Sequence, residues 1–287
     1  MTDTSARRRI MASPLRYPGG KGSLYARLRR VIRDNGLAGC TYVEPYAGGA
    51  GAGLALLVTG QVNKVVINDL DPAIHAFWST LTTDPDAMIS RIKKVPLNVK
   101  EWRRQKEIYA AEEADSSALG FATFYLNRTN RSGVLNGGPI GGIDQTGNYL
   151  IDARFNREEL SERVRTLGLF SGQIDVTCAD GRAVVRKYAA KSDTFLYADP
   201  PYFEKAGSLY MNYFKAEDHE ALAKDLNAKS DGRWLLTYDA VPQVETLYAG
   251  RRRRQFGLHY SAHRVIKATE VAVLSDPLID IGEGWEI

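Results

Sequence analysis

Two short stretches of the sequence bring together residue types that bind ligands. The first is a glycine-rich turn over residues 47–53, which follows the apolar run Thr41-Tyr42-Val43 and leads into a helical pattern. Asp69 ends the next apolar run, 21 residues after Gly48. In a strand–loop–helix–strand unit, glycines let the backbone approach a ligand, and the acidic residue accepts hydrogen bonds from ribose hydroxyls. The spacing predicts a site for an adenosine-bearing cofactor, with a glycine turn that only packs a helix on a strand as the plainer alternative.

The second stretch is Asp199-Pro200-Pro201-Tyr202, directly after the apolar strand pattern of residues 195–198. The two prolines keep the preceding residues extended and remove two backbone donors. A carboxylate, carbonyl groups and an aromatic ring are then held at the carboxyl end of a strand, where open α/β sheets bind ligands. A rigid turn that happens to carry Asp and Tyr is the simpler interpretation.

Alternating apolar runs and helical patterns indicate which elements position these stretches. Strands are expected at 41–43, 64–67, 174–178, 194–198, 233–238 and 270–274. Helices are expected at 23–35, 54–58, after Pro72, 181–190, 217–228 and 241–249. Residues 85–126 lack strand patterns and predict helices, and 127–148 read as a glycine-rich loop or hairpin. The pattern predicts one α/β domain with a parallel sheet and flanking helices, interrupted by a mostly helical insert.

Composition and charge narrow the class of protein. Hydrophobic residues make up 44% and charged residues 25% of the 287 residues, which excludes disordered and fibrous classes. No apolar run approaches the roughly 18 residues that span a bilayer, and no apolar segment follows Arg7–Arg9 as in a secretory signal. Cys40 and Cys178 lack metal-site spacing and fit a reducing compartment. We expect a soluble, cytoplasmic protein that holds no metal and is not associated with a membrane.

The net charge of +4 permits nucleic acid as a partner without demonstrating it. Basic residues gather near the N-terminus and in the run Arg251–Arg254. Such runs could contact phosphates, but a solvated face or a loose tail is the simpler expectation.

Together with Pro18-Gly19-Gly20-Lys21, these stretches form a recognisable set. The chain resembles the DNA adenine methylase family, the D12 class of N6-adenine DNA methyltransferases. The matching stretches are LRYPGGKGSL (15–24), YVEPYAGGAG (42–51), INDLDP (67–72), FYLNRT (124–129), CADG (178–181) and LYADPPY (196–202). Weaker likeness continues through LLTYD (235–239) and TEVAVL (269–274). The resemblance covers nearly the whole chain, and the conjunction of motifs is far more specific than any one of them.

The resemblance implies an α/β fold with a Rossmann-like methyltransferase sheet, flanking helices and an inserted, mostly helical DNA-recognition domain with a glycine-rich hairpin. Residues 13–75 and 156–287 would form the catalytic domain, which depends on S-adenosyl-L-methionine. Residues 76–155 would form the target-recognition domain, and residues 1–12 a flexible tail. One chain carries every expected motif, so a monomer acting on double-stranded DNA is the simplest expectation, encoded by a bacterium or a phage.

The resemblance also implies which residues contact S-adenosylmethionine: Tyr17, Lys21, Glu44, Gly48, Gly49, Asp69, Asp180 and Asp199. Tyr17 is a departure, because a tryptophan is familiar there. Glu44 and the glycine loop would lie under the methionine part, Asp69 on the ribose, and Asp180 near the adenine of the cofactor. Asp180 could equally cap the helix expected at 181–190.

Methylation of adenine N6 gives the tetrapeptide a catalytic role. The N6 lone pair is delocalised into the ring, and acceptors that bind both N6 hydrogens make the nitrogen more tetrahedral. The Asp199 carboxylate and the Pro200 carbonyl suit that task, and positioning for direct in-line transfer supplies most of the acceleration. Tyr202 would stack on the target base after its extrusion from the duplex.

Target recognition would belong to the insert. Donors and acceptors that suit base edges in the major groove come from Asn127, Arg128, Asn130, Arg131 and Ser132. Arg131 could instead bind phosphate, and Asn127 could hydrogen-bond its own loop. The family often reads GATC, but residues 130–142 agree least with it, so no target sequence is expected here.

Several other functions fit parts of the pattern. N4-cytosine methylation uses the same amine geometry, but its tetrapeptide more often begins with Ser. Relatives that methylate glutamine or RNA bases tend to carry Asn at that place. A DNA-binding protein of the same fold without catalysis is disfavoured by intact Lys21, Asp69, Asp199 and Tyr202. An NAD-dependent oxidoreductase is disfavoured because the third glycine of G-x-G-x-x-G is missing.

Overall fold

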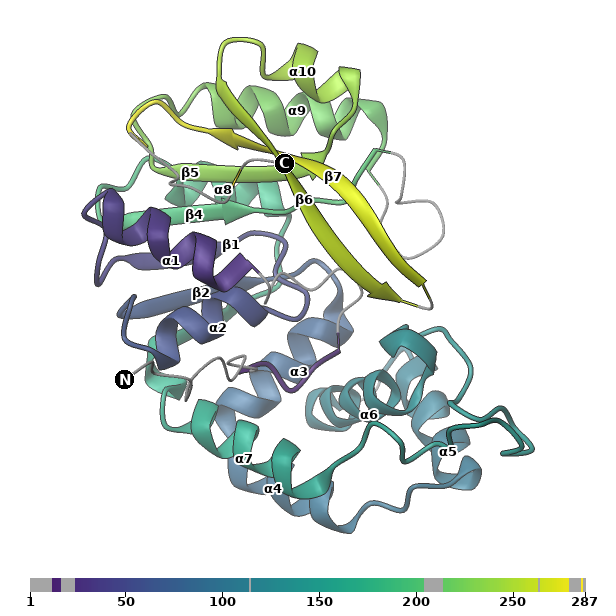
Figure 1. Cartoon of the computed structure of the whole chain (residues 1–287). Helices are drawn as coiled ribbons and strands as arrows, with labels where there is room; N and C mark the ends of the chain where they lie inside the picture. Colours follow the sequence, from purple (N-terminus) through teal and green to yellow (C-terminus); the bar gives the residue numbers. More distant parts are fainter. Residues whose placement is uncertain are drawn as a thin grey trace, which may run out of the picture.

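Five short strands and two longer ones form a seven-stranded sheet in the computed structural model, which describes residues 12–16, 24–113, 115–203, 214–262, 264–278 and 285. The strands are β1 (Thr41–Glu44), β2 (Lys64–Asn68), β3 (Ile174–Thr177), β4 (Thr194–Ala198), β5 (Trp234–Asp239), β6 (Arg252–Ala262) and β7 (Arg264–Leu274). Their order is β3-β2-β1-β4-β5-β7-β6. The first five pair in parallel, and β7 runs antiparallel to both β5 and β6 (Figure 1). The expected α/β fold is confirmed, but the sheet is mixed rather than parallel throughout.

Helices cover both faces of the sheet because the strand residues alternate between two apolar clusters. Tyr42, Val65 and Phe195 face the side that carries α1 (Tyr25–Asp34), α2 (Gly51–Val58) and α3 (Pro72–Thr83). Their neighbours Val43, Val66 and Leu196 face the side that carries α8 (Gly181–Tyr188), α9 (Ala216–Asn227) and α10 (Pro242–Leu247). The sheet is therefore the middle layer of three.

A group of helices lies beside the sheet, in the lower part of Figure 1. It consists of α4 (Pro85–Lys94), α5 (Val99–Ala110), α6 (Ser116–Thr129) and α7 (Arg157–Gly168). Phe77 of α3 stacks on Phe124 of α6 with ring centroids 5.9 Å apart, and Phe124 contacts Phe155 at 5.5 Å. These rings belong to the same apolar cluster as the α1–α3 face of the sheet. The helical group is thus anchored to the sheet through α3. None of the described helices is long and apolar enough to cross a membrane.

Asp and Asn side chains determine where several helices begin. Asp71 accepts a hydrogen bond from the Ala73 amide at 2.8 Å, and Pro72 occupies the first helical position, where no amide donor is needed. The same capping contact is made at the starts of α4, α5, α6, α7 and α8 by Asp84, Asn98, Asp115, Asn156 and Asp180. These caps fix the helix starts; those of α3 and α8 agree with the pattern in the sequence, whereas α7 was not expected.

The glycine-rich segment differs from its expected form. Helix α6 continues through Thr129, so the first residues of the expected loop are helical. Beyond it, residues 130–148 form turns and a single isolated bridge between Asn130 and Pro139, without two paired strands. Gly133, Gly141 and Gly142 have positive φ angles of 77°, 85° and 79°, which only glycine adopts at low cost. Of the two expected forms, the segment adopts the loop and not the hairpin, because these left-handed turns interrupt strand pairing.

The arginine run at 251–254 is part of the fold. It leads into β6, and its side chains are tied to the backbone. Arg251 donates to the Asn227 carbonyl at 2.7 Å, and Arg252 donates to the carbonyls of Ser275 and Asp276 at 3.1 and 2.8 Å. The run is therefore no loose tail, because these guanidinium groups satisfy carbonyls at the edge of the sheet, whereas the exposed Arg252 and Arg254 agree with the expected solvated face.

The contact between α3 and α6 yields a prediction. A Cβ atom added to Gly120 would lie 2.5 Å from the Ala76 carbonyl oxygen and 2.5 Å from Thr80 Oγ1. We expect Gly120→Ala to lower the free energy of unfolding by about 1–3 kcal/mol, because the clash outweighs the roughly 1 kcal/mol that alanine gains in a helix. Urea denaturation measures the change. Gly250→Ala, where a Cβ atom meets nothing within 4 Å, is the control and should be nearly neutral.

Candidate active site

The carboxyl ends of the parallel strands bring the predicted site residues to one edge of the sheet. Glu44 ends β1, Asp69 follows β2, and Asp199 follows β4. Strand β1 pairs with β2 on one side and with β4 on the other. Ligands of open α/β sheets bind at such a switch in strand order, outside the carboxyl ends.

The glycine loop and Asp69 meet as the spacing predicts. The Gly48 amide donates to Asp69 Oδ2 at 2.9 Å, and the Asp71 amide donates to Asp69 Oδ1 at 3.0 Å. Gly48 has a φ of 48°, and its carbonyl accepts a hydrogen bond from Trp78 Nε1 at 2.9 Å. Burial raises the pKa of Asp69 to about 6. The loop is therefore held by the carboxylate itself, which binds two backbone amides and retains lone pairs for further donors.

Glu44 is buried beneath the same loop. Its Oε1 accepts hydrogen bonds from the Tyr42 hydroxyl at 3.0 Å and from the Gly53 amide at 3.2 Å. Burial raises the pKa of Glu44 to about 8, against the opposing effect of these two donors. Gly53 is needed here because a Cβ atom would lie 2.8 Å from the Tyr42 ring.

Asp199 and Tyr202 are joined by hydrogen bonds. Tyr202 Oη lies 3.1 Å from Asp199 Oδ1, which also accepts a hydrogen bond from Thr237 Oγ1 at 2.9 Å. Thr237 in turn contacts the Tyr197 hydroxyl at 2.7 Å. Tyr202 Oη also lies 2.8 Å from Glu270 Oε1, so its single proton faces two carboxylates. The Asp199 tetrapeptide is thus held by side chains of β5 and β7, and Tyr197 of β4 supports Thr237 from behind.

Asp180 starts α8 as a helix cap, with its carboxylate accepting from the Arg182 amide at 2.8 Å. The next residue, Gly181, packs so closely on Tyr46 that a Cβ atom would lie 2.3 Å from the ring. The Tyr46 hydroxyl is buried and has no hydrogen-bond partner among the described residues. Asp180 therefore has the capping role that the sequence analysis weighed. The unpartnered Tyr46 hydroxyl lies near the start of the same helix.

Three of the residues expected to read DNA make hydrogen bonds within the protein. Asn127 is buried and exchanges hydrogen bonds with the backbone of Arg16, at 2.7 Å in each direction. Asn130 donates to the carbonyls of Val134 and Leu135 and accepts from Trp102 Nε1 at 2.7 Å. Their polar groups are thus occupied by the protein, which agrees with the alternative weighed for Asn127, and contact of these residues with DNA stays a prediction.

Arg128 also makes its hydrogen bonds within the protein. Its guanidinium is buried and donates to the Arg154 carbonyl, with Nε at 2.8 Å. Burial is the main cause that lowers the pKa of Arg128 to about 9. By contrast, Arg131 is exposed and Ser132 is half-buried, with a left-handed φ of 55°. Tyr17 and Lys21 lie outside the described residues.

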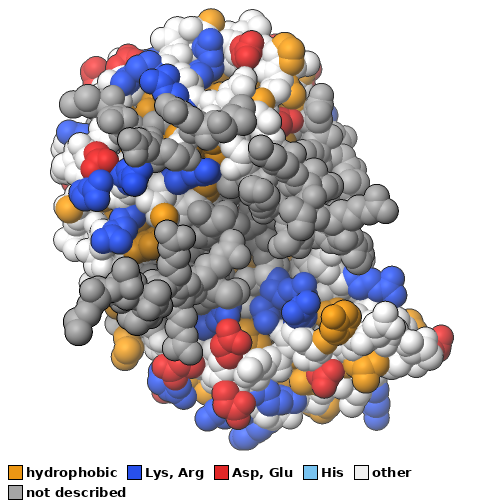
Figure 2. Space-filling view, viewed as in Figure 1, with side chains coloured by type: hydrophobic (Ala, Val, Ile, Leu, Met, Phe, Trp, Pro, Cys, Tyr) orange, Lys and Arg blue, Asp and Glu red, His pale blue; other side chains and the backbone are white. Residues whose placement is uncertain are grey.

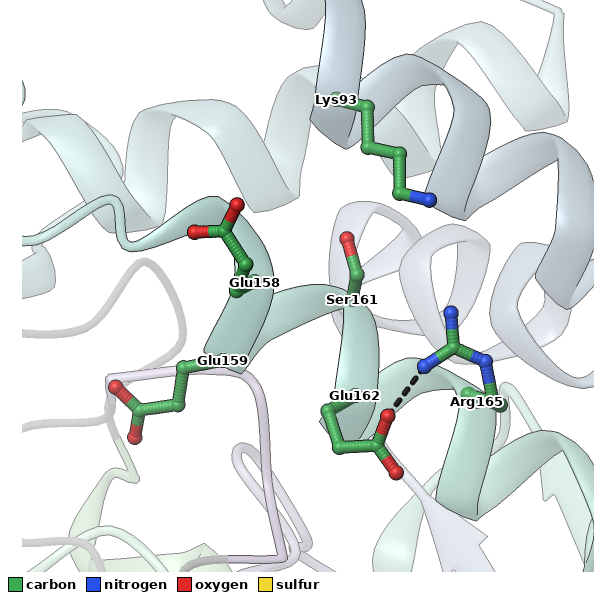
Figure 3. Close-up of a pocket in the computed structure, with 6 residues that line it drawn as sticks. All are labelled: Lys93, Glu158, Glu159, Ser161, Glu162 and Arg165. Atoms are coloured by element: carbon green, nitrogen blue, oxygen red, sulfur yellow. Dashed lines mark hydrogen bonds and ion pairs between the residues drawn. The ribbon is translucent and has the colours of Figure 1, made fainter.

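A pocket of about 410 Å³ lies elsewhere, between α4 and α7 (Figure 3). It is lined by Lys93, Glu158, Glu159, Ser161, Glu162 and Arg165. An ion pair joins Glu162 to Arg165 within it. None of the strand-end residues lines this pocket, so it is separate from the candidate active site. The described residues contain no group of three side chains arranged to hold a metal ion.

Thr237 and Glu270 are site residues that the sequence analysis did not single out. Both lie in stretches of weaker likeness, LLTYD and TEVAVL. The sequence could have indicated them, because each stretch places a polar residue next to apolar strand residues. Glu270 is fully buried on β7 and Thr237 is fully buried on β5. A buried polar group in a central strand requires a partner, and here that partner is the tetrapeptide.

Comparison with known proteins identifies the family. The DNA adenine methylases of two strains of Vibrio cholerae serotype O1, Classical Ogawa and El Tor Inaba, are each 26% identical over 255 residues, covering 82% of this chain and 84% of theirs. A crystal structure from Pyrococcus horikoshii, described as that of a candidate RNA methyltransferase, covers 91% of this chain and 87% of its own at 12% identity. Its TM-score of 0.43 is too low to bear on function.

The family comparison covers most of the chain. Residues 17–266 match the D12 class of N6 adenine-specific DNA methyltransferases, a span that contains the glycine loop, Asp69 and the Asp199 tetrapeptide. This match and the named relatives support DNA adenine methylation as the activity, which is that of a transferase. The chain belongs to the D12 class N6 adenine-specific DNA methyltransferase family.

Proposed function

We propose that this protein transfers a methyl group from S-adenosylmethionine to N6 of adenine in double-stranded DNA, with Asp199, Pro200 and Tyr202 at the reacting centre. The observation that carries the proposal is the edge formed by β2, β1 and β4. There the glycine loop with Asp69 lies on one side of β1 and the Asp199 tetrapeptide on the other. This arrangement supports adjacent sites for the cofactor and for the base, as direct transfer requires.

The residues at this edge suit S-adenosylmethionine. Asp69 can accept hydrogen bonds from ribose hydroxyls, and the Tyr46 hydroxyl lacks a partner among the described residues. Glu44 and Asp69 both have raised pKa values because of burial, so a positively charged ligand nearby would stabilise their ionised forms. When bound, S-adenosylmethionine supplies an electrophilic methyl group on a sulfonium. We assign Tyr17, Lys21, Gly49 and Asp180 to the same site from the family resemblance.

The tetrapeptide would prepare the amine for attack. We assign an Asp199 oxygen and the Pro200 carbonyl as acceptors of the two N6 hydrogens, which directs the nitrogen lone pair out of the ring plane. N6 must lose one proton as the new bond to carbon forms, and Asp199 is the group that we assign to receive it. Tyr202 would stack on the flipped base and exclude water from it.

The first prediction concerns Asp199. We expect Asp199→Ala to lower methyl transfer by about 100-fold or more, the scale on which loss of a preorganised polar group acts. The assay is transfer of label from S-adenosylmethionine to unmethylated plasmid DNA, with the product digested to nucleosides. Label in N6-methyladenosine supports the proposal, whereas label in N4-methylcytidine would replace adenine by cytosine as the target.

The matched control for this variant is Asp193→Ala, at the opposite end of β4. Asp193 is exposed and precedes the strand, so its side chain is remote from the carboxyl edge. We expect this control to transfer methyl groups at the wild-type rate. Near-normal transfer by Asp199→Ala would contradict the role assigned to Asp199.

The second prediction concerns cofactor binding and pH. Hydrogen bonds from ribose hydroxyls favour the ionised form of Asp69, whose pKa is about 6 in the free protein. Affinity for S-adenosylmethionine should therefore fall as the pH is lowered from 7.5 through 6, because Asp69 becomes protonated. Isothermal titration calorimetry measures this dependence. Asp69→Asn should bind more weakly at pH 7.5 and lose the part of the pH dependence that is centred near 6, whereas the part due to Glu44, centred near 8, remains. An unchanged pH dependence near 6 in this variant would remove Asp69 from the cofactor site.

The third prediction concerns DNA. Lys and Arg side chains are distributed over the upper and lower parts of the face shown in Figure 2. If they contact phosphates, the affinity for a labelled duplex should fall steeply with salt, by about 10³-fold between about 50 and 200 mM for six or more contacts. Fluorescence anisotropy measures the slope.

The exposed Arg131 offers a sharper form of this test. Arg131→Ala should reduce the slope by about one if Arg131 contacts a phosphate. Arg165→Ala is the control, because that guanidinium is engaged by Glu162 on α7. A flat salt response of the wild-type protein would mean that duplex DNA is not its substrate.

A further inference from the structure

Glu270 is a buried carboxylate that the proposed reaction does not use. It lies on β7, opposite Asp239 of β5 and Phe256 of β6, and its side chain is fully shielded from solvent. The Tyr202 hydroxyl donates to its Oε1 at 2.8 Å, across 68 residues of sequence. A carboxylate inside a sheet is costly unless its oxygens are hydrogen-bonded. A strand that served only to complete the sheet would need no carboxylate at this position.

The Tyr202 hydroxyl faces two carboxylates at once. Its oxygen lies 2.8 Å from Glu270 Oε1 and 3.1 Å from Asp199 Oδ1. A phenol has one proton to donate, so the shorter contact directs that proton toward Glu270. Asp199 Oδ1 still receives the Thr237 hydroxyl at 2.9 Å. Glu270 thus competes with Asp199 for the Tyr202 proton. Because Glu270 takes that proton, the Asp199 oxygens remain more available as acceptors for the amine.

The surroundings make Glu270 a rigid partner for Tyr202. Strand β7 is paired on both sides, with β5 and with β6. The Tyr202 ring lies 6.2 Å from the Tyr238 ring, tilted by 50°. Arg27 of α1 lies over the Phe256 ring at 5.0 Å, and its charge interacts favourably with Glu270. The acceptor is therefore fixed by the sheet, whereas Tyr202 lies in a segment without regular secondary structure.

We propose that Glu270 is a positioning residue for methyl transfer. By accepting the Tyr202 hydroxyl, it fixes the orientation of the ring on which the target base stacks and keeps that hydroxyl from competing with the amine for Asp199. This role rests on the proposed function, because it acts through Tyr202 and Asp199. Without the acceptor, Tyr202 would turn its proton to Asp199, and both the stacking surface and the amine acceptor would be misplaced.

The test is steady-state kinetics with labelled S-adenosylmethionine and unmethylated plasmid DNA. We expect Glu270→Ala and Tyr202→Phe each to lower kcat about tenfold, as for one hydrogen bond to a charged group, with KM for S-adenosylmethionine changed less than twofold. Glu270→Gln retains an acceptor oxygen and should recover most of the rate lost in Glu270→Ala. The double variant should be no slower than the slower single variant. Glu245→Ala, at an exposed position on α10, is the matched control.

Each outcome decides the proposal. If the two losses multiply in the double variant, Glu270 does not act through Tyr202, and the proposal is wrong. If Glu270 only stabilised the sheet, adding Glu270→Ala to Tyr202→Phe would slow methyl transfer further, and Glu270→Ala would lower the melting temperature. If Glu270→Ala fails to fold, the comparison of Glu270→Gln with Tyr202→Phe remains, and a wild-type rate for Tyr202→Phe overturns the proposal. Absence of transfer by the wild-type protein would instead contradict the proposed function itself.

Discussion

Parallel pairing of β2, β1, β4 and β5 is the constraint on which the site depends. Parallel strands all end at the same edge, so the residues that follow them meet there whatever their separation in sequence. Glu44, Asp69 and Asp199 are brought together in this way. The two prolines after Asp199 and the positive φ at Gly48 then hold each loop close to the edge. The site is a consequence of strand direction combined with a few stiff turns.

Burial of carboxylates gives this edge its electrostatic character. Burial raises the pKa values of Glu44 and Asp69 to about 8 and 6, because removal of water penalises their charged forms. Hydrogen bonds from the Gly48 and Gly53 amides and from the Tyr42 hydroxyl offset part of that cost. The same donors hold the glycine loop in place. The hydrogen bonds from Gly48 and Gly53 therefore both hold the loop and keep the two carboxylates in place at this edge.

Polar residues of the helical group have a different task. The side chain of Asn127 fastens the segment that holds Arg16 to α6, and Asn130 binds the turn at Val134 and Leu135. Arg128 binds the backbone at Arg154. These buried contacts determine the path of the glycine-rich segment, where the exposed Arg131 lies. Asn127, Arg128 and Asn130 thus stabilise the backbone next to this segment.

The sequence by itself determined the strand–loop–helix order, the helix caps and the two ligand-binding stretches. Each depends on residues adjacent in the chain, such as Asp71-Pro72 or the tetrapeptide at Asp199, whose local geometry and chemistry follow from residue type. Only the tertiary structure decided which polar groups are buried. Asn127 and Arg131 are both polar residues of the same stretch of sequence. Asn127 is nevertheless buried against the Arg16 backbone, whereas Arg131 is exposed. It also joined Tyr202 to Glu270, because strand pairing rather than sequence distance brings them together.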